Sequence, residues 1–145
     1  MKTLGIRKAK LDDWKQISLL LDQLDYPNTD EFIKDKLEKL LLDNNEELVV
    51  YEENQEVIAF ISIHFIPQIA VKGDFARISY FAVDSSIRSK GIGRMLEEYC
   101  TELATKRKCD RIEVHCHSRR TDAHRFYERQ GFTESPKYFI KLLSQ

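Results

Sequence analysis

Apolar residues recur along the chain at two spacings, one typical of helices and the other typical of strands. The first segment, residues 3–8, alternates apolar and polar positions as a short strand does. Two stretches with helical spacing follow, at residues 11–24 and 29–42, and a Tyr-Pro-Asn break separates them. The pattern therefore predicts one strand followed by two amphipathic helices.

The middle of the chain is rich in β-branched and aromatic residues and predicts three consecutive strands. Residues 47–51 and 57–65 are expected to form a hairpin, and residues 75–83 the next strand. The run 57–65 is nearly continuous in apolar residues, which is typical of a central strand covered on both faces. The spacing then predicts a helix over 95–106, a strand over 110–115, a helix over 122–130 and a strand over 138–143.

These elements, in the order β-α-α-β-β-β-α-β-α-β, predict a single α/β domain over residues 1–145. The expected sheet is mixed and mostly antiparallel, and four helices flank it. One strand–helix–strand unit, from about residue 78 to 115, has the crossover that makes neighbouring strands parallel. The sequence shows no repeat, linker or low-complexity segment, so we expect no second domain.

The most specific chemistry lies where the strand at 75–83 passes into the next helix. Residues 87–94 read Ile-Arg-Ser-Lys-Gly-Ile-Gly-Arg. The N–H groups in the first turn of a helix have no carbonyl partner, and the helix dipole adds partial positive charge there. Gly91 and Gly93 carry no Cβ that would keep a ligand away from those amides. Three basic residues, Arg88, Lys90 and Arg94, surround the same amides. This stretch therefore predicts a binding site for a diphosphate.

Two other phosphate-binding patterns do not fit this stretch. A P-loop has its lysine after the last glycine and an earlier glycine upstream, whereas here lysine precedes glycine. A dinucleotide-binding fingerprint would need a third glycine where Leu96 stands. The remaining pattern, Arg-x-x-Gly-x-Gly after a strand, resembles the pyrophosphate-binding motif of the GNAT superfamily of acyl-CoA-dependent N-acetyltransferases.

Residues 123–132, Ala-His-Arg-Phe-Tyr-Glu-Arg-Gln-Gly-Phe, carry the second part of this resemblance. The last helix of the superfamily commonly reads Ala-x-x-x-Tyr-x-x-x-Gly-Phe, and this stretch matches every fixed position. One helix and one strand separate the two motifs, as they do in the superfamily. The motifs cover about the C-terminal half of the chain, which is similar to small single-domain bacterial members.

The resemblance implies a GNAT-like fold with acetyl-CoA as cosubstrate. The pantetheine arm is then expected in a gap between the strand ending at Val83 and the strand ending at His115. The implied cofactor-binding residues are Phe81, Ala82, Val83, Arg88, Ser89, Lys90, Gly91, Ile92, Gly93, Arg94, Ser118, His124 and Phe126. Ser118 is a departure from the family pattern, because many members carry an asparagine in that region.

The same resemblance implies direct transfer of the acetyl group to a primary amine, with Tyr127 as the catalytic acid. The amine attacks the thioester, and a backbone N–H near Val83 polarises the carbonyl oxygen. The leaving thiolate needs a proton, and a phenol, with an ordinary pKa of about 10, still holds one at neutral pH. Without the motif, Tyr127 would instead be interpreted as an ordinary core tyrosine.

The group that removes the proton from the amine stays open at this point. The candidates are His64, Glu113, His115, His117 and a chain of water molecules. The last three of these side chains alternate on one face of a predicted strand, which also suggests metal ligands. A metal site needs further ligands, however, and we expect no metal.

The acceptor also stays open. Residues 14–26, the second helix and the loop at 67–73 are expected to form its pocket, and none of them carries a motif. We favour a small-molecule amine over a protein N-terminus or a lysine side chain. The alternative outside enzymes is an acyl-CoA-binding sensor. The presence of both Tyr127 and the glycine stretch favours an enzyme, since a sensor needs only the glycine stretch.

Composition narrows these alternatives only a little. The chain has 145 residues, 42% of them apolar, and a formal net charge of −1, so no global positive field would hold nucleic acid. Three cysteines without metal-type spacing predict free thiols in a reducing compartment. Since no apolar run is long enough to span a membrane and no signal peptide is recognised, we expect a cytoplasmic protein. A homodimer is left open.

Overall fold

The computed structural model describes residues 4–116, 120–135 and 138–143, without the side chains of residues 88–90. The chain folds as two compact units, residues 1–115 and 116–145. The first unit holds the sheet and most of the predicted site, and the second holds the last helix.

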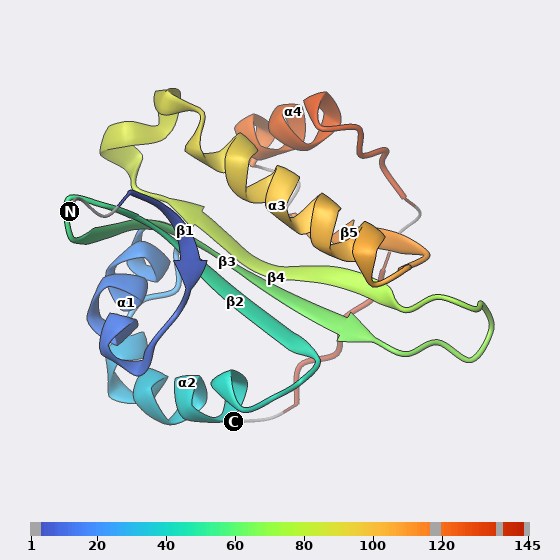
Figure 1. The fold of residues 1–145 in the computed structure, drawn as a ribbon, viewed down its shortest axis with the longest axis horizontal. Helices are drawn as coiled ribbons and strands as arrows, with labels where there is room; N and C mark the ends of the chain where they lie inside the picture. The colour runs from blue at the N-terminus through green and yellow to red at the C-terminus, as the bar shows by residue number, and fades with distance from the viewer. Residues whose placement is uncertain (1–3, 117–119, 136–137, 144–145) are drawn as a thin grey trace. The chain divides into compact units, whose positions relative to one another are not determined.

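The first unit is built on a five-stranded sheet with the order β1-β2-β3-β4-β5 (Figure 1). The strands are β1 (Leu4–Lys8), β2 (Glu46–Glu53), β3 (Glu56–Ile66), β4 (Phe75–Val83) and β5 (Arg111–Val114). All neighbouring strands are antiparallel except β4 and β5, which are parallel. The prediction of a mixed, mostly antiparallel sheet is confirmed.

Helices cover both faces of this sheet (Figure 1). The helices are α1 (Trp14–Gln23), α2 (Ile33–Leu41) and α3 (Ile92–Lys106), with short 3₁₀ turns η1 (Leu11–Asp13), η2 (Thr29–Glu31) and η3 (Ser85–Lys90). The helix predicted over 29–42 is split at Phe32, where φ is −140°. Helices α1 and α2 contact β2, β3 and β4, and α3 contacts β3, β4 and β5.

Strand β3 is central, as its continuous apolar sequence predicts. Every residue from Val57 to Ile63 is buried. Phe60 belongs to the core cluster formed with α1 and α2, together with Leu48 and Val50 of β2. Because side chains alternate along a strand, Ile61 and its neighbours at every second position face the other side, where α3 lies.

The second unit contains α4 (Thr121–Arg129), close to the predicted range. This helix ends in a Schellman motif: Phe132 N–H donates to the carbonyl of Tyr127, and Gly131 N–H donates to that of Glu128, each at 3.0 Å. Gly131 has φ +95°, the left-handed conformation that this motif requires. The sequence predicts this end of the helix correctly.

The prediction of a strand over residues 138–143 is wrong. These residues join no sheet in the described structure, and the side chains of Phe139 and Leu142 are 90% and 84% exposed. An apolar run satisfies the composition of a strand, but a strand forms only when a neighbouring strand accepts its backbone hydrogen bonds.

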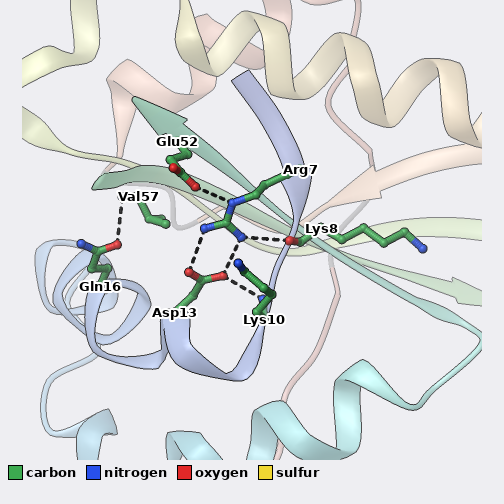
Figure 2. A network of polar contacts seen from close by, with 7 residues as sticks. All are labelled: Arg7, Lys8, Lys10, Asp13, Gln16, Glu52 and Val57. Atoms are coloured by element: carbon green, nitrogen blue, oxygen red, sulfur yellow. Dashed lines mark hydrogen bonds and ion pairs between the residues drawn. The ribbon is translucent and has the colours of Figure 1, made fainter. Parts of the chain in front are cut away.

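Arg7 ties the first strand to the start of α1 (Figure 2). Its guanidinium donates to both carboxylate oxygens of Asp13, at 2.9 and 3.0 Å, and to Glu52 at 2.5 Å. Asp13 also accepts the backbone N–H of Lys10 at 2.8 Å. Burial alone would raise the pKa of Asp13, but the hydrogen bonds and charges of Arg7 and Lys10 outweigh burial and lower the pKa below its ordinary value.

Asp13→Asn is therefore expected to cost stability by an amount that depends on pH. A carboxyl whose pKa is lower in the folded state stabilises the fold above its unfolded pKa, about 4, and loses this contribution as the pH falls through the folded value. We expect the variant to lose about 2 kcal/mol at pH 7 and a smaller amount at an acidic pH well below about 4. Urea unfolding at both pH values measures this, with the exposed neighbour Asp12→Asn as the control. An equal loss in both variants would contradict it.

Candidate functional site

Strands β4 and β5 pair along only part of β4. Their parallel register runs from Phe75↔Arg111 to Ile78↔Val114. Strand β5 ends at Val114, one residue before His115, where the sequence predicts the end of the strand. Strand β4 continues to Val83. The expected pantetheine contacts, residues 81–83, lie on this continuation of β4, which β5 does not pair with.

The turn after β4 is fixed by side-chain contacts on both sides. Asp84 accepts hydrogen bonds from the backbone N–H and the Oγ–H of Ser86, at 2.9 and 2.7 Å. The backbone N–H of Ser85 donates to the side-chain oxygen of Gln23, at the end of α1, at 2.8 Å. The turn that leads to the predicted diphosphate site is therefore bonded to α1.

Helix α3 begins immediately after a glycine in the left-handed conformation. Gly91 is the N-cap residue, with φ +77° and ψ 12°. The helix starts at Ile92 rather than at the predicted Met95, because Gly93 accepts helical geometry within the first turn. An ideal Cβ built on Gly91 meets no described atom within 4 Å. A substituent there would therefore point into open space rather than into the fold.

The first amides of α3 have the geometry of an anion site. The first hydrogen bond of the helix runs from Met95 N–H to the Gly91 carbonyl, at 3.1 Å. The N–H groups of residues 92–94 precede it, so the helix itself offers them no carbonyl. Gly91 has no side chain with which to cap them. These residues fit the phosphate groups of a nucleotide-type cofactor.

The predicted cations around these amides are only partly described. The side chains of Arg88, Ser89 and Lys90 lie outside the described part of the structure. Arg94 extends along the helix and donates to Glu98 at 2.9 Å, and its side chain is 70% exposed. In this conformation Arg94 neutralises a carboxylate of α3 rather than lying over the first turn.

Two tyrosines meet on the α1–α2 side of the sheet. The rings of Tyr26, in the α1–η2 connection, and Tyr80, on β4, pack edge to face with centroids 5.3 Å apart. Both are partly exposed, and burial, followed by the neighbouring Tyr26, raises the pKa of Tyr80. Beside them Ser62 pairs with Tyr80 and Ile63 with Ile78, so Ser79 forms a β-bulge. The bulge lies where the pairing with β5 stops.

One end of the same sheet face carries polar side chains that the sequence did not connect. Glu46 of β2 accepts a hydrogen bond from Ser62 Oγ at 2.6 Å and contacts Nδ1 of His64 at 3.2 Å. Arg77 of β4 donates to Glu113 of β5 at 2.7 Å. Ser62 and His64 are polar at alternate positions of an apolar run, which is the signal that could have pointed to this cluster.

The cysteines have the properties of buried or partly buried thiols rather than of nucleophiles. Burial, followed by the charges of Glu97 and Cys109, raises the pKa of Cys100 to about 12. Burial also raises the pKa values of Cys109 and Cys116. A reactive cysteine needs the opposite shift, so these thiols give no support to a covalent acyl-enzyme.

The second unit holds the other predicted site residues. Tyr127 is half-buried in α4, and its ring packs edge to face on Phe126 and on Phe132, with centroids 5.4 Å apart in each pair. His124 lies on the same helix. Ser118 and His117 lie outside the described residues.

Neither a metal site nor a membrane span appears in the described parts of the chain. No group of three or more His, Cys, Asp or Glu side chains is placed there to hold a metal ion. None of the described helices is long and apolar enough to cross a membrane.

Comparison with known proteins gives matches along nearly the whole chain. The model of the acetyltransferase (GNAT) family matches residues 11–132. The aminoalkylphosphonate N-acetyltransferase of Salmonella typhimurium is 28% identical over 148 residues, which cover 99% of this chain and 94% of that protein. The uncharacterized N-acetyltransferase YhdJ of Bacillus subtilis is 28% identical over 143 residues, 97% of this chain and 96% of that protein.

A solved structure supports the same fold. Glucosamine-6-phosphate N-acetyltransferase from Arabidopsis thaliana superposes with a TM-score of 0.83 at 23% identity, over 98% of this chain and 99% of that one. The likeness extends over the sheet and the helices.

Proposed function

The chain belongs to the GNAT family of acetyltransferases, and from this premise we propose that it transfers the acetyl group of acetyl-CoA directly to the primary amine of a small molecule. The observation that carries the proposal is the start of α3. Among the described side chains none caps its first amides, which follow Gly91, a left-handed glycine at the end of the η3 turn. GNAT acetyltransferases use acetyl-CoA as cosubstrate, and these amides suit its diphosphate.

In this proposal the diphosphate binds the amides of residues 91–94, with Arg88, Ser89 and Lys90 on the preceding turn. The pantetheine arm follows β4 beside residues 81–83, where β5 no longer pairs. The thioester then lies toward the β-bulge at Ser79, and a backbone N–H of β4 polarises its carbonyl oxygen. Ser118, His124 and Phe126 are proposed as further contacts of the cofactor.

The transfer itself needs one acid and one base. A neutral amine attacks the carbonyl carbon, a carbon–nitrogen bond forms, and the carbon–sulfur bond breaks. We assign Tyr127 as the acid that protonates the leaving thiolate, on the strength of the family motif that contains it. Because the cysteine thiols resist ionisation, direct attack is favoured over an acetylated cysteine.

A small-molecule acceptor is supported by the relative from Salmonella typhimurium, whose name specifies aminoalkylphosphonates and whose match covers 99% of this chain. The two exposed tyrosines and the polar cluster beside them lie on the α1–α2 side of the sheet. Together they present aromatic rings and charged side chains that a small polar amine can contact. We propose an amine of this class, with the aminoalkylphosphonates as the first compounds to test.

The test uses purified protein, acetyl-CoA and a panel of amines, with release of free CoA thiol as the readout. The panel holds 2-aminoethylphosphonate, amino acids, polyamines, an aminoglycoside and a lysine-containing peptide. We expect turnover with at least one small amine. Turnover with the peptide alone would favour a protein acetyltransferase. Tight CoA binding without turnover on any amine would favour an acyl-CoA sensor.

A further inference from the structure

The polar cluster on the α1–α2 face is organised as a row across four strands. Glu46 pairs with His64, His64 with Arg77, and Arg77 with Glu113. Residues directly opposite one another in a sheet project from the same face. The row therefore faces the same side as Leu48, Val50 and Phe60, which pack against α1 and α2.

Glu46 is the buried member of this row. Its side chain is 3% exposed, whereas that of His64 is 39% exposed. Burial raises the pKa of Glu46, while the hydrogen bonds from Ser62 and His64 act in the opposite direction. A buried carboxylate with two hydrogen-bonding partners is a fixed group, whereas the imidazole next to it reaches solvent.

The contact between these residues determines which nitrogen of His64 is available. An ionised carboxylate can only accept hydrogen bonds, so beside ionised Glu46 the His64 ring donates Nδ1–H across the 3.2 Å contact. In a neutral imidazole the lone pair then belongs to Nε2. A carboxylate that orients an imidazole in this way produces a base with a defined direction.

The position of His64 matches the requirement for a base. His64 pairs with Arg77 and Ser62 pairs with Tyr80, so these two pairs lie on either side of the β-bulge at Ser79. His64 is therefore next to the bulge, on the α1–α2 face of the sheet. We propose that His64 accepts the amine proton on Nε2 as the catalytic base and that Glu46 positions it. This inference rests on the proposed function, in which the thioester lies toward the bulge. The amine proton passes to Nε2, and the thiolate takes its proton from Tyr127.

Among the described charged groups around His64, Glu46 is the one that pairs with it. On β4, Arg77 lies opposite His64, but its guanidinium donates to Glu113 at 2.7 Å. Asp43 acts on Glu46 and raises its pKa together with burial. Since Glu113 is paired with Arg77, it is a weaker candidate for the base than His64.

His64→Gln is expected to lower kcat/KM about 100-fold at pH 7 and to leave the Kd of acetyl-CoA unchanged. The loss should shrink as the pH rises toward the pKa of an alkylamine, about 10, because the amine then loses its proton to solvent. Glu46→Gln should lower kcat/KM about tenfold or more, because the amide no longer fixes the tautomer. The control is Glu56→Gln, which removes an exposed carboxylate at the other end of β3.

The pH dependence distinguishes catalysis from structure. A loss of equal size at every pH, or no loss, would overturn the assignment, as would a loss in His115→Gln that shows the pH dependence expected of His64→Gln. If wild-type protein acetylates no amine in the panel, the proposed function fails instead.

Nitrogen-15 NMR of the histidine rings decides the geometry without any acceptor. The His64 signal is identified by its absence in His64→Gln. A neutral ring protonated on Nδ1 supports the proposal, and a ring protonated on Nε2 overturns it.

Discussion

Gly91→Val and Gly93→Val are each expected to raise the Kd of acetyl-CoA at least about tenfold, since each hydrogen bond to a charged group contributes about 1.5–3 kcal/mol. The reason is the position of the two residues around the first amides of α3. A branched side chain there fills the space that the diphosphate would use. Isothermal titration with CoA measures the effect directly.

The two variants separate binding from backbone strain. Valine at position 91 must adopt φ +77°, which costs stability as well. Gly93 lies within the helix, so valine there adds no such strain. Gly5→Val is the matched control, because Gly5 also has positive φ, +111°, and no described atom within 4 Å of an added Cβ. It lies on β1, with β2 and β3 between it and β4. Normal CoA binding by Gly93→Val would contradict the proposed diphosphate site.

Tyr127→Phe should lower kcat by about 10²–10⁴-fold while the Kd of acetyl-CoA stays the same. Removing the hydroxyl deletes the proposed proton donor, and the remaining ring can still pack on Phe126 and Phe132. Steady-state kinetics with the best acceptor of the panel, together with CoA titration, provide the measurement. Tyr51→Phe removes a hydroxyl from β2 and serves as the control. Unchanged turnover in Tyr127→Phe would remove this residue from the proposed role.

Much of the fold follows from local patterns. The apolar run of β3 predicts a central strand because such a run can be buried only on both faces. Gly131 predicts the end of α4, because a Schellman motif needs a residue with positive φ. The sequence predicts the start of α3 at Met95 rather than at Ile92, because Gly93 is a poor helix former and is accepted only in the first turn. The last strand failed because an apolar sequence does not supply a pairing partner.

The candidate site is predictable where one segment makes it and not where several strands meet. Gly91 and the amides after it are contiguous, so a short motif reveals them. The contact between Glu46 and His64 depends instead on the register between β2 and β3. That register shifts at an irregularity between Tyr51 and Glu52, and the apolar pattern does not reveal where such an irregularity falls. The sequence identified His64 as a candidate base, but its carboxylate partner became visible only in the folded chain.

The raised pKa values of the cysteines have a practical consequence. Disulfide reagents that report free thiols react with the thiolate, and an unperturbed thiol ionises near pH ~8.5. Cys100, with a pKa of about 12, stays almost wholly protonated at assay pH, and Cys109 and Cys116 are shifted in the same direction. The protein should therefore contribute a slow, separable background, so that CoA released during turnover can be followed continuously by its colour reaction.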